Sequence, residues 1–446
     1  MSEDSRDYVM RMAREHRVKF IRLWFTDMLG LLKSFAITVE ELEDALDNGK
    51  VFDGSSIEGF TRVEESDMVA VPDPETFCVL PWSSSHGQEA VARMFCDICR
   101  PDGSAYEADP RQVLKRNLER AKQMGYTYYI GAEQEYFYFK DNSDRPPQGL
   151  DHGGYFDLTP LDVASDLRRN TVRTLEKMGI PTESSHHEIA PSQHEIDLRY
   201  EDALSMADNT MTFRLVVKEI ALREGVWATF MPKPLAEHDG SGMHIHQSLF
   251  KGEQNLLYDP KDNNRLSGLA KAFIAGLLRH APEIVAITNQ WVNSYKRLVA
   301  GYDAPVHVTW ALRNRTSMVR VPLVNPNKKL SIRVEFRVPD PACNPYLAFS
   351  VMLAAGLEGI EKGYELPPAV EEDITAVSAE ELESRGIERL PDNLLDAVRR
   401  MEKSSLVRSA LGDDLFEKLV QNKKIEWQRY HQRISEYEME RYLPLL

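Results

Sequence analysis

The sequence predicts a mixed α+β protein of two domains. Its 446 residues exceed what one hydrophobic core usually fills. A stretch rich in turn-forming residues, "RPDGSAYEADP" at 100–110, divides a short N-terminal part from a longer part in which predicted strands and helices alternate. The composition, with 42% hydrophobic and 28% charged residues, is that of an ordinary globular protein. We therefore expect a small domain over residues 1–105 and a large domain over residues 106–446.

The N-terminal part predicts a hairpin followed by a helix. The segments "VKFIRLWFTD" (18–27) and "LLKSFAIT" (31–38) predict two strands joined by a turn. Thr38 followed by Glu41 is a capping-box pattern, which predicts that a helix begins here, and Gly49 predicts where it ends.

Cysteine usage favours neither a disulfide framework nor a metal site. The chain has four cysteines, and only Cys96 and Cys99 form a C-x-x-C pair. A zinc site of this kind needs a second pair, whereas Cys78 and Cys343 are isolated. Because the surrounding "RMFCDICR" predicts a strand, we expect buried or half-buried thiols.

The large part is predicted to begin with a helix and to end in helices. "RQVLKRNLERAKQMG" (111–125) has a helical apolar period and ends at a glycine, and "YTYYIGAEQEYFYF" (126–139) predicts a strand. A further helix is predicted after Pro345, and residues 392–446 are predicted to be helical. The apolar stripe expected to face the core in that last region consists of Leu394, Leu395, Val398 and Met401.

The charge balance and the N-terminus restrict the class of protein. A formal net charge of -16, without a stripe of lysines and arginines, argues against binding to nucleic acid. The N-terminus "MSEDSRDY" is acidic where a signal peptide is basic, and no stretch approaches the roughly 18 apolar residues of a membrane span. We expect a cytoplasmic protein without a membrane partner.

Two histidines one residue apart give the first indication of chemistry. His244 and His246 lie in "SGMHIHQSLF" (241–250), which predicts a strand, so both imidazoles point to one face. Such a pair also fits a hydrogen-bonded pair in a core or on a surface. The neighbouring Gly240 and Gly242 would allow the backbone to approach a ligand closely.

Glutamates repeat this arrangement in another predicted strand and in a segment interrupted by proline. Glu133 and Glu135 share one face of "GAEQEYFYF", where the alternatives are a solvated edge strand and a cation that compensates both charges. In "ESSHHEIAPSQHEIDLRY" (183–200), Pro191 excludes one continuous helix, so the chain must turn and bring acids from separate short elements together. The acids of this segment are Glu183, Glu188 and Glu195.

Alternating charges mark one more strand. In "IRVEFRVPDP", Arg333, Glu335 and Arg337 lie on one face, an arrangement that a salt-bridged, solvated surface also explains.

The acids and the imidazole together favour a hard divalent cation. Such ligands suit Mg²⁺ or Mn²⁺ better than zinc, and two adjacent ions of this kind commonly serve phosphoryl transfer. The proposed ligand set is Glu133, Glu135, Glu188, Glu195, Glu335 and one histidine. No P-loop and no strand-bound glycine motif for dinucleotides is present, so metals and side-chain cations would have to hold a nucleotide's phosphates. The available arginines are Arg297, Arg313, Arg315, Arg320, Arg333 and Arg337.

Several motifs occur in an order and spacing that resembles type I glutamine synthetases of the bacterial and archaeal type, over nearly the whole chain. They are "FDGSSIEGF" (52–60), the glutamates at 133 and 135, "HHE…QHE" (186–195), "MPKPL…GSGMHIH", "NSYKRLV.GY.AP", "NRT…R.P" and "R.E.R.PDPACNPYLAF". The resemblance implies a small N-terminal β-grasp-like domain and a large C-terminal catalytic domain with a curved antiparallel sheet and helices. It also implies a homo-oligomer, a dodecamer of two hexameric rings whose active sites lie between subunits.

By this resemblance we expect an ATP-dependent enzyme that joins ammonia to the γ-carboxylate of glutamate through γ-glutamyl phosphate. The products are glutamine, ADP and phosphate, and two Mg²⁺ or Mn²⁺ ions serve each active site. One ion would be held by Glu135, Glu188 and Glu195, and the other by Glu133, His244 and Glu335.

The resemblance also implies roles for the remaining site residues. ATP would be bound by Glu183, Tyr200, His246, Ser248, Arg315, Arg320 and Arg333. Glutamate would be bound by Gly240, Arg297 and Arg337. Ammonium would be bound by Asp53 and Ser56 of a neighbouring subunit together with Tyr155. The catalytic residues would be Asp53, Asp303, Arg315 and Arg337.

Two positions depart from the family pattern. The family usually has glutamate where this chain has Asp303, on a flap over the intermediate, and asparagine where this chain has Asp239. Added acid favours a cationic amine, so a γ-glutamyl-amine ligase acting on a polyamine or monoamine is the alternative function, although Asp53 matches the ammonia-using enzymes. A ring-forming relative without catalysis and a metallohydrolase are further alternatives; the complete ligand set argues against the first, and the arginines and "DGSS" argue against the second.

Two regulatory expectations complete the comparison with the family. Thr375 stands at about the place of the tyrosine that some relatives use for adenylylation, so we expect no such control. Arg62 resembles an arginine that takes part in feedback inhibition by glutamine in one branch of the family.

Overall fold

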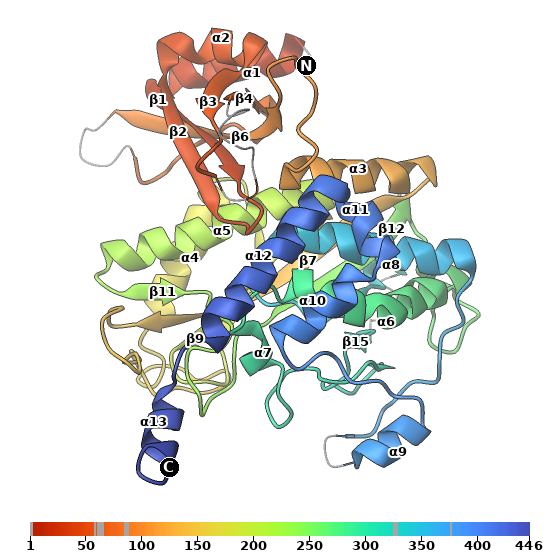
Figure 1. Ribbon diagram of the computed structural model, residues 1–446. Coiled ribbons are helices and arrows are strands. Elements are labelled where there is room, and N and C mark those ends of the chain that lie inside the picture. Colours follow the sequence, from red (N-terminus) through yellow and green to blue (C-terminus); the bar gives the residue numbers. More distant parts are fainter. Residues whose placement is uncertain (1–2, 58, 60–66, 84–88, 324–328, 375–376) are drawn as a thin grey trace.

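The computed structural model describes residues 3–446 apart from 58, 60–66, 84–88, 324–328 and 375–376. Arg62 and Thr375 therefore lie outside the described residues. The chain forms a small N-terminal domain and a large domain, each with its own sheet and helices, so the predicted α+β class is confirmed (Figure 1).

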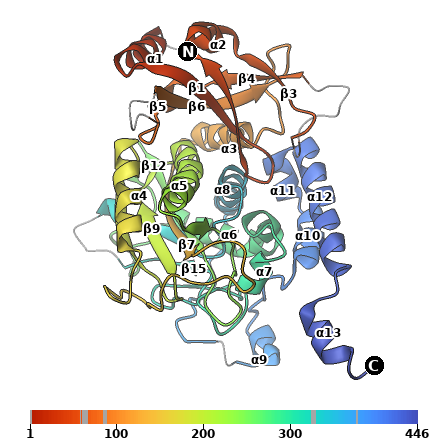
Figure 2. The same cartoon turned by 90° about the vertical axis from the view of Figure 1, so that its left-hand side faces the viewer.

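The small domain is a six-stranded sheet with two helices on its outer face (Figure 2). The sheet order is β2-β1-β6-β4-β3, with β5 added to β6. Its strands are β1 (Val18–Thr26), β2 (Leu32–Thr38), β3 (Lys50–Asp53), β4 (Asp67–Pro72), β5 (Cys78–Val79) and β6 (Ala90–Cys99), and its helices are α1 (Glu3–Glu15) and α2 (Leu42–Asn48). β1 and β2 pair antiparallel, which confirms the predicted hairpin, whereas β1 and β6 pair parallel.

The predicted capping box at Thr38 is wrong. The first turn after Thr38 is a 3-10 turn over Val39–Glu41 without a side-chain cap, and α2 begins only at Leu42. Lys50 draws Glu41 away, with 2.6 Å between its Nζ and Glu41 Oε2. Gly49 ends α2 as predicted, at a φ of 71°, which glycine tolerates.

The large domain is built on a ten-stranded sheet of order β14-β15-β16-β12-β7-β9-β8, with β10 and β11 on β7 and β13 on β12. Its strands are β7 (Thr127–Phe139), β8 (Thr182–His187), β9 (Gln193–Leu198), β10 (Glu201–Asp202), β11 (Trp227–Thr229), β12 (Met243–Lys251), β13 (Gln254–Asn255), β14 (Trp310–Ala311), β15 (Val319–Arg320) and β16 (Val334–Phe336). The pairing is antiparallel as predicted except between β14 and β15, which run parallel.

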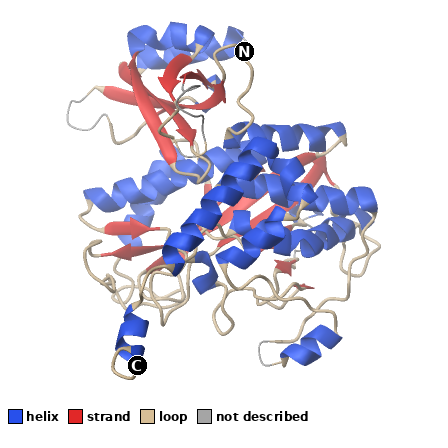
Figure 3. Cartoon of the chain, viewed as in Figure 1, coloured by secondary structure: helices blue, strands red, loops and turns tan. Residues whose placement is uncertain are grey.

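Helices pack around this sheet, and long loops gather at the end of the domain away from the small domain (Figure 3). They are α3 (Pro110–Gln123), α4 (Ser165–Lys177), α5 (Ala203–Arg223), α6 (Gly268–Thr288), α7 (Ser294–Arg297), α8 (Pro345–Lys362), α9 (Ala379–Ser384), α10 (Leu394–Glu402), α11 (Ser405–Leu411), α12 (Asp413–His431) and α13 (Glu436–Tyr442). Helices α6 and α8 approach so closely that a Cβ on Gly276 would lie 2.2 Å from the carbonyl oxygen of Ala355. Glycine is therefore required at this crossing.

The predicted apolar stripe near the C-terminus is largely confirmed. Leu394, Val398 and Met401 are buried on α10, but Leu395 is only half-buried, and Ala397 takes the fourth core position. Most buried apolar side chains form one cluster that runs through both domains, and α3 contacts elements of each domain. Phe137, Phe139 and Ala190 form a second, small cluster. No helix within the described ranges is long and apolar enough to cross a membrane.

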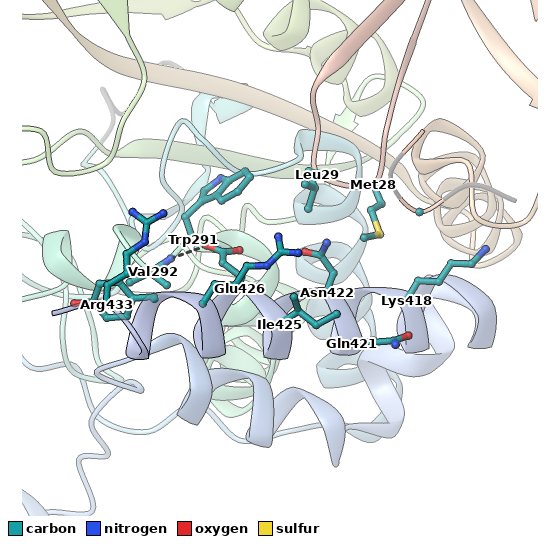
Figure 4. A pocket seen from close by; sticks show the side chains of 13 residues that line it. Met28, Leu29, Trp291, Val292, Lys418, Gln421, Asn422, Ile425, Glu426 and Arg433 are labelled. Atoms are coloured by element: carbon teal, nitrogen blue, oxygen red, sulfur yellow. Dashed lines mark hydrogen bonds between the residues drawn. The ribbon is translucent and has the colours of Figure 1, made fainter. Parts of the chain in front are cut away.

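A cavity of about 650 Å³ lies where the small domain meets the C-terminal helices (Figure 4). Met28 and Leu29 from the β1–β2 turn face α12, and the backbone N–H of Val292 donates to Glu426 Oε1 at 3.2 Å. These contacts fix the C-terminal helices against the junction of the two domains.

Candidate active site

Strand register brings the predicted acids and histidines to one face of the large sheet. His244 lies opposite Glu133 in the β7–β12 pair, and His246 lies opposite Glu335 in the β12–β16 pair. Glu135 lies opposite Glu195 in the β7–β9 pair. Because side chains alternate along strands, this register collects groups from four strands on one face. The solvated edge strand and the solvated salt-bridged surface are both excluded, since Glu335 is 0% exposed and Glu135 is 7% exposed.

One half of this acid cluster is compensated by fixed cations. Arg337 NH1 donates to Glu335 Oε1 at 2.7 Å, and Arg320 contacts the other oxygen of Glu335. His246 Nε2 lies 2.5 Å from Glu133 Oε1. Burial opposes ionisation of Glu335, but His246, Arg337 and His244 outweigh it and lower its pKa to about 2. We call Glu133, Glu335 and the arginines and histidines that contact them the compensated half.

The other half has too little positive charge. Glu135 Oε2 accepts hydrogen bonds from Gly242 N–H at 2.8 Å and from Gln193 Nε2 at 3.0 Å, but burial and the charge of Glu188 raise its pKa well above the ordinary value. Burial, Asp197 and Glu135 likewise raise the pKa of Glu195. We call Glu135, Glu188 and Glu195 the uncompensated half.

His244 stands between the two halves. Its Nδ1 lies 3.3 Å from Glu133 Oε2 and its Nε2 lies 3.9 Å from Glu135 Oε1. The Nε2 atom is buried without a hydrogen-bond partner. A divalent cation would neutralise buried carboxylates with raised pKa values and give the imidazole nitrogen a partner, so these residues fit a hard divalent ion.

Within the acid cluster, the residues whose possible metal-ligand atoms lie closest together form two groups of three. Each group differs by one residue from the ligand set that the resemblance implies. Ligand atoms of Glu133, His246 and Glu335 lie within 4.8 Å of one another, as do those of His186, Glu188 and Glu195. Thus His246 rather than His244 lies closest to the compensated half, and His186 Nε2 pairs with Glu188 Oε1 at 2.7 Å. Both groups draw on the same cluster.

A cavity of about 590 Å³ adjoins the compensated half. It is lined by five of the residues expected to bind ATP: Glu183, Tyr200, His246, Ser248 and Arg333. Arg333 Nε donates to His246 Nδ1 at 3.1 Å, so a cationic group lies at the junction of cavity and cluster. The other two expected residues lie elsewhere: Arg320 contacts Glu335, and Arg315 lies close to Tyr155, which raises the pKa of Arg315.

Two aromatic residues of this cavity were missed in the sequence. Tyr129 and Phe250 line it and pack edge-to-face, with ring centroids 5.0 Å apart. Tyr129 shares its strand face with Glu133, and Phe250 shares its face with His246. The same two-residue period that relates the two histidines extends to these rings and would have found them.

Of the residues expected to bind glutamate, Gly240 and Arg297 lie beside the uncompensated half, whereas Arg337 belongs to the compensated half; Arg297 is largely occupied. Its guanidinium donates to the carbonyl oxygens of Val338 at 2.8 Å and Arg337 at 3.2 Å. A Cβ on Gly240 would lie 2.3 Å from the carbonyl oxygen of Pro232. The sequence suggested that these glycines let the backbone approach a ligand. In the structure they let the backbone approach other atoms of the protein.

Asp303, which the resemblance places on a flap, reaches the compensated half. Arg337 NH2 donates to both carboxylate oxygens of Asp303, at 3.2 and 3.3 Å. The backbone N–H of Asp303 donates to Asp239 Oδ1 at 2.8 Å. The two residues that depart from the family pattern are therefore in direct contact.

The expected ammonium residues are divided between the domains. Asp53 ends β3 of the small domain and is exposed, as is Ser56, whereas the cluster lies on the large sheet (Figure 1). Tyr155 lies in a loop of the large domain and is 43% exposed. One chain alone does not bring Asp53 and Ser56 to the cluster.

Comparison with known families gives two matches in chain order. The model described as the glutamine synthetase β-grasp domain matches residues 17–101, and the model described as the glutamine synthetase catalytic domain matches residues 107–442. A glutamine synthetase from Mycolicibacterium smegmatis is 54% identical over 442 residues, covering 99% of each chain. One from Methanosarcina mazei is 49% identical over 444 residues, covering 99% of this chain and 98% of its own.

Solved structures are similar over the same extent. The structure of GmaS with ADP has a TM-score of 0.88 at 32% identity and covers 98% of this chain and 99% of that chain. The structure of Plasmodium falciparum glutamine synthetase has a TM-score of 0.88 at 24% identity and covers 99% of each chain, a likeness of fold.

Proposed function

The chain belongs to the glutamine synthetase family and makes glutamine from glutamate, ammonia and ATP, and we propose that the acid cluster with its adjoining cavity carries out this reaction. The observation that carries the proposal is the pairing of a compensated and an uncompensated half within one buried cluster, directly beside a nucleotide-sized cavity.

We propose that two divalent cations, Mg²⁺ or Mn²⁺, bind in the cluster. One would be held by Glu135, Glu188 and Glu195, and the other by Glu133, His244 and Glu335. The raised pKa values of Glu135 and Glu195 and the unpartnered Nε2 of His244 support this assignment. When bound, the cations supply positive charge that neutralises the charge developing on phosphate oxygens.

ATP would occupy the 590 Å³ cavity with its base toward the aromatic wall and its phosphates toward the cluster. The proposed contacts are Glu183, Tyr200, His246, Ser248 and Arg333, with Arg315 and Arg320 toward the transferring phosphate. The solved complex of GmaS with ADP supports nucleotide binding on this fold.

The chemistry then needs a phosphoryl acceptor and an amine. The γ-carboxylate of glutamate, oriented by Gly240, Arg297 and Arg337, attacks the γ-phosphorus of ATP, and ADP leaves. Ammonia displaces phosphate from the resulting γ-glutamyl phosphate. Asp53 of a neighbouring subunit, with Ser56 and Tyr155, would bind ammonium and take its proton, and Asp303 would exclude water. Arg315 and Arg337 would stabilise the negative charge on the transferring phosphate.

The site is incomplete within one chain, which supports a homo-oligomer. Asp53 and Ser56 lie on the small domain, away from the cluster, so a second subunit would have to supply them. The C-terminal segment around α13 exposes apolar side chains that association would bury. They are Ile434, Tyr437, Met439, Leu443, Leu445 and Leu446. We propose the dodecamer of two hexameric rings, in the cytoplasm.

A γ-glutamyl-amine ligase remains the second candidate. The Asp303 backbone N–H donates to Asp239 Oδ1, so Asp239 adds an acid next to the expected flap residue, which favours a cationic amine. Asp53 matches the ammonia-using enzymes and therefore favours ammonium as the substrate.

The test is an assay of product formation with ATP, Mg²⁺ and glutamate that compares ammonium with putrescine and ethanolamine. The proposal predicts glutamine and phosphate in equal amounts with ammonium, and at most weak turnover with the amines. Turnover that saturates with an amine but not with ammonium would establish the second candidate.

A further inference from the structure

Two histidines that directly precede proposed metal ligands point away from the acid cluster. His187 precedes Glu188, and His194 precedes Glu195. Neighbouring residues in extended chain face opposite sides, so each glutamate can face the cluster only while its histidine faces the opposite side. His187 and His194 are paired across β8 and β9, their ring centroids lie 4.8 Å apart, and both are buried.

The opposite side of this hairpin holds both ends of one loop, residues 151–162. At one end, Asp151 Oδ1 lies 3.1 Å from His187 Nε2. At the other end, Asp162 receives two hydrogen bonds from Arg168, at 2.6 and 3.1 Å. Arg168 in turn donates to His194 Nδ1 at 2.8 Å. Each end of the loop is thus tied to one of the two histidines.

His187 uses both ring nitrogens in this arrangement. Its Nδ1 lies 2.7 Å from the carbonyl oxygen of Glu188, while its Nε2 faces Asp151. A Cβ on Gly153 would lie 2.7 Å from the same Nε2, so the loop backbone packs directly on the imidazole. His187 therefore joins the loop to the main chain of a proposed metal ligand.

The same loop carries Tyr155, which reaches Glu188 from the other side. The Tyr155 ring packs edge-on to His186, with centroids 5.4 Å apart, and His186 Nε2 lies 2.7 Å from Glu188 Oε1. Tyr155 also lies close enough to Arg315 to raise the pKa of its guanidinium. A shift of the loop would move Tyr155 relative to the cluster.

Two atoms of this network lack a partner. Asp151 Oδ2 and His194 Nε2 are buried without a hydrogen bond. Since arginine only donates, His194 Nδ1 accepts from Arg168, and the His194 proton is on Nε2. One carboxylate oxygen of Asp151 and one nitrogen of each histidine lie within 4.8 Å of one another. A donor beside an acceptor fits a bridging water and repels a cation, so this second cluster of histidines and acid is not a metal site.

We propose that His187 and Asp151 are positioning residues that hold the Tyr155 loop in register with the acid cluster. The inference rests on the proposed function, in which Tyr155 belongs to the ammonium site. Neither residue touches substrate; both act through Tyr155 and Glu188.

A double-mutant cycle tests the proposal, with kinetics measured for His187→Ala, Tyr155→Ala and the double variant. Each single change is expected to raise the KM for ammonium about tenfold and to leave the KM for ATP within about twofold, and the double variant is expected to match the worse single variant. His152→Ala is the matched control, because His152 is the exposed histidine of the same loop and should behave as wild type.

Additive effects, an equal rise in all KM values, or unchanged KM for ammonium in His187→Ala would each overturn the proposal. If His187→Ala fails to assemble, Asp151→Asn replaces it in the cycle, since it preserves the shape of the side chain and removes the charge that faces His187. Wild-type turnover with ammonium is measured first and reports on the proposed function alone. If wild type uses only an amine, the same cycle is read on the KM for that amine.

Discussion

The two halves of the acid cluster contain the same kind of residue on the same sheet but differ in ionisation. In the compensated half, Arg320, Arg337 and His246 surround the carboxylates, and the pKa of Glu335 falls to about 2. In the uncompensated half, burial and neighbouring acids raise the pKa values of Glu135 and Glu195. The difference arises from the cations within reach, since burial opposes ionisation in both halves.

This difference separates two tasks. The uncompensated half has an excess of negative charge that only an added cation can neutralise, so it should bind a divalent ion more strongly. In the compensated half, Arg320 and Arg337 can release the carboxylate of Glu335 and bind a phosphate oxygen instead, because guanidinium groups bind both. Arg337, which also contacts Asp303, connects this half to the flap.

Glu335→Ala should have the largest effect, because it breaks the compensated half. It removes a proposed ligand and leaves Arg320 and Arg337 without their shared partner. We expect metal-dependent glutamine formation to fall more than about 100-fold while the oligomer stays assembled, measured by product formation and by size-exclusion chromatography. Glu388→Ala, which removes an exposed ion pair with Arg400, is the control and should stay within about twofold of wild type. Near-normal activity of Glu335→Ala would contradict the assignment.

Glu195→Gln tests the uncompensated half. Since the pKa of Glu195 is raised in the folded protein, its contribution to stability is present below the unfolded pKa and is lost as pH rises through the folded pKa. At neutral pH without metal, the variant should therefore melt higher than wild type by about 2 °C, and the gain should vanish in acid. Mn²⁺ should raise the Tm of wild type more than that of the variant. If the metal-free variant had a lower Tm than wild type at neutral pH, Glu195 would not lack compensating positive charge, contrary to its assignment to the uncompensated half.

Asp303→Asn tests the link between flap and cluster. The change keeps the shape of the side chain but removes the charge that pairs with Arg337. We expect kcat/KM for ammonium to fall about tenfold and more phosphate to be released per glutamine formed, because the flap closes less firmly over the intermediate. Unchanged coupling of phosphate to glutamine would show that the ion pair does not close the site.

Asp239→Asn should have the smallest effect. Asparagine retains the oxygen that accepts the Asp303 N–H, so docking of the flap is preserved and only a charge is lost. Selectivity for ammonium over methylammonium, measured by competition, should change less than about threefold. A larger change would make Asp239 a determinant of amine selectivity.

Local periodicity explains what the sequence could predict. Alternation along a strand placed His244 with His246 and Glu133 with Glu135 on common faces, because it depends only on neighbouring residues. The same rule extends to Tyr129 and Phe250, which were overlooked. The resemblance supplied the order of the motifs and the α+β class.

Long-range register explains what it could not predict. Nothing local states that Glu195 lies opposite Glu135, or that Arg320 from a two-residue strand contacts Glu335. The capping-box prediction failed for a similar reason, since Lys50 competes for Glu41 from the next strand. The buried contact of His187 with Asp151 joins residues 36 positions apart.

The most direct test of the central claim is a titration of the metal-free protein with Mn²⁺ in the absence of nucleotide, comparing wild type with Glu195→Gln and Glu335→Gln. The account predicts two sites of unequal affinity per chain in wild type. Glu195→Gln should lose the tighter site, and Glu335→Gln should lose only the weaker one. A single class of equal sites, or loss of the tighter site in Glu335→Gln, would contradict the division of the cluster into a cation-binding half and a compensated half.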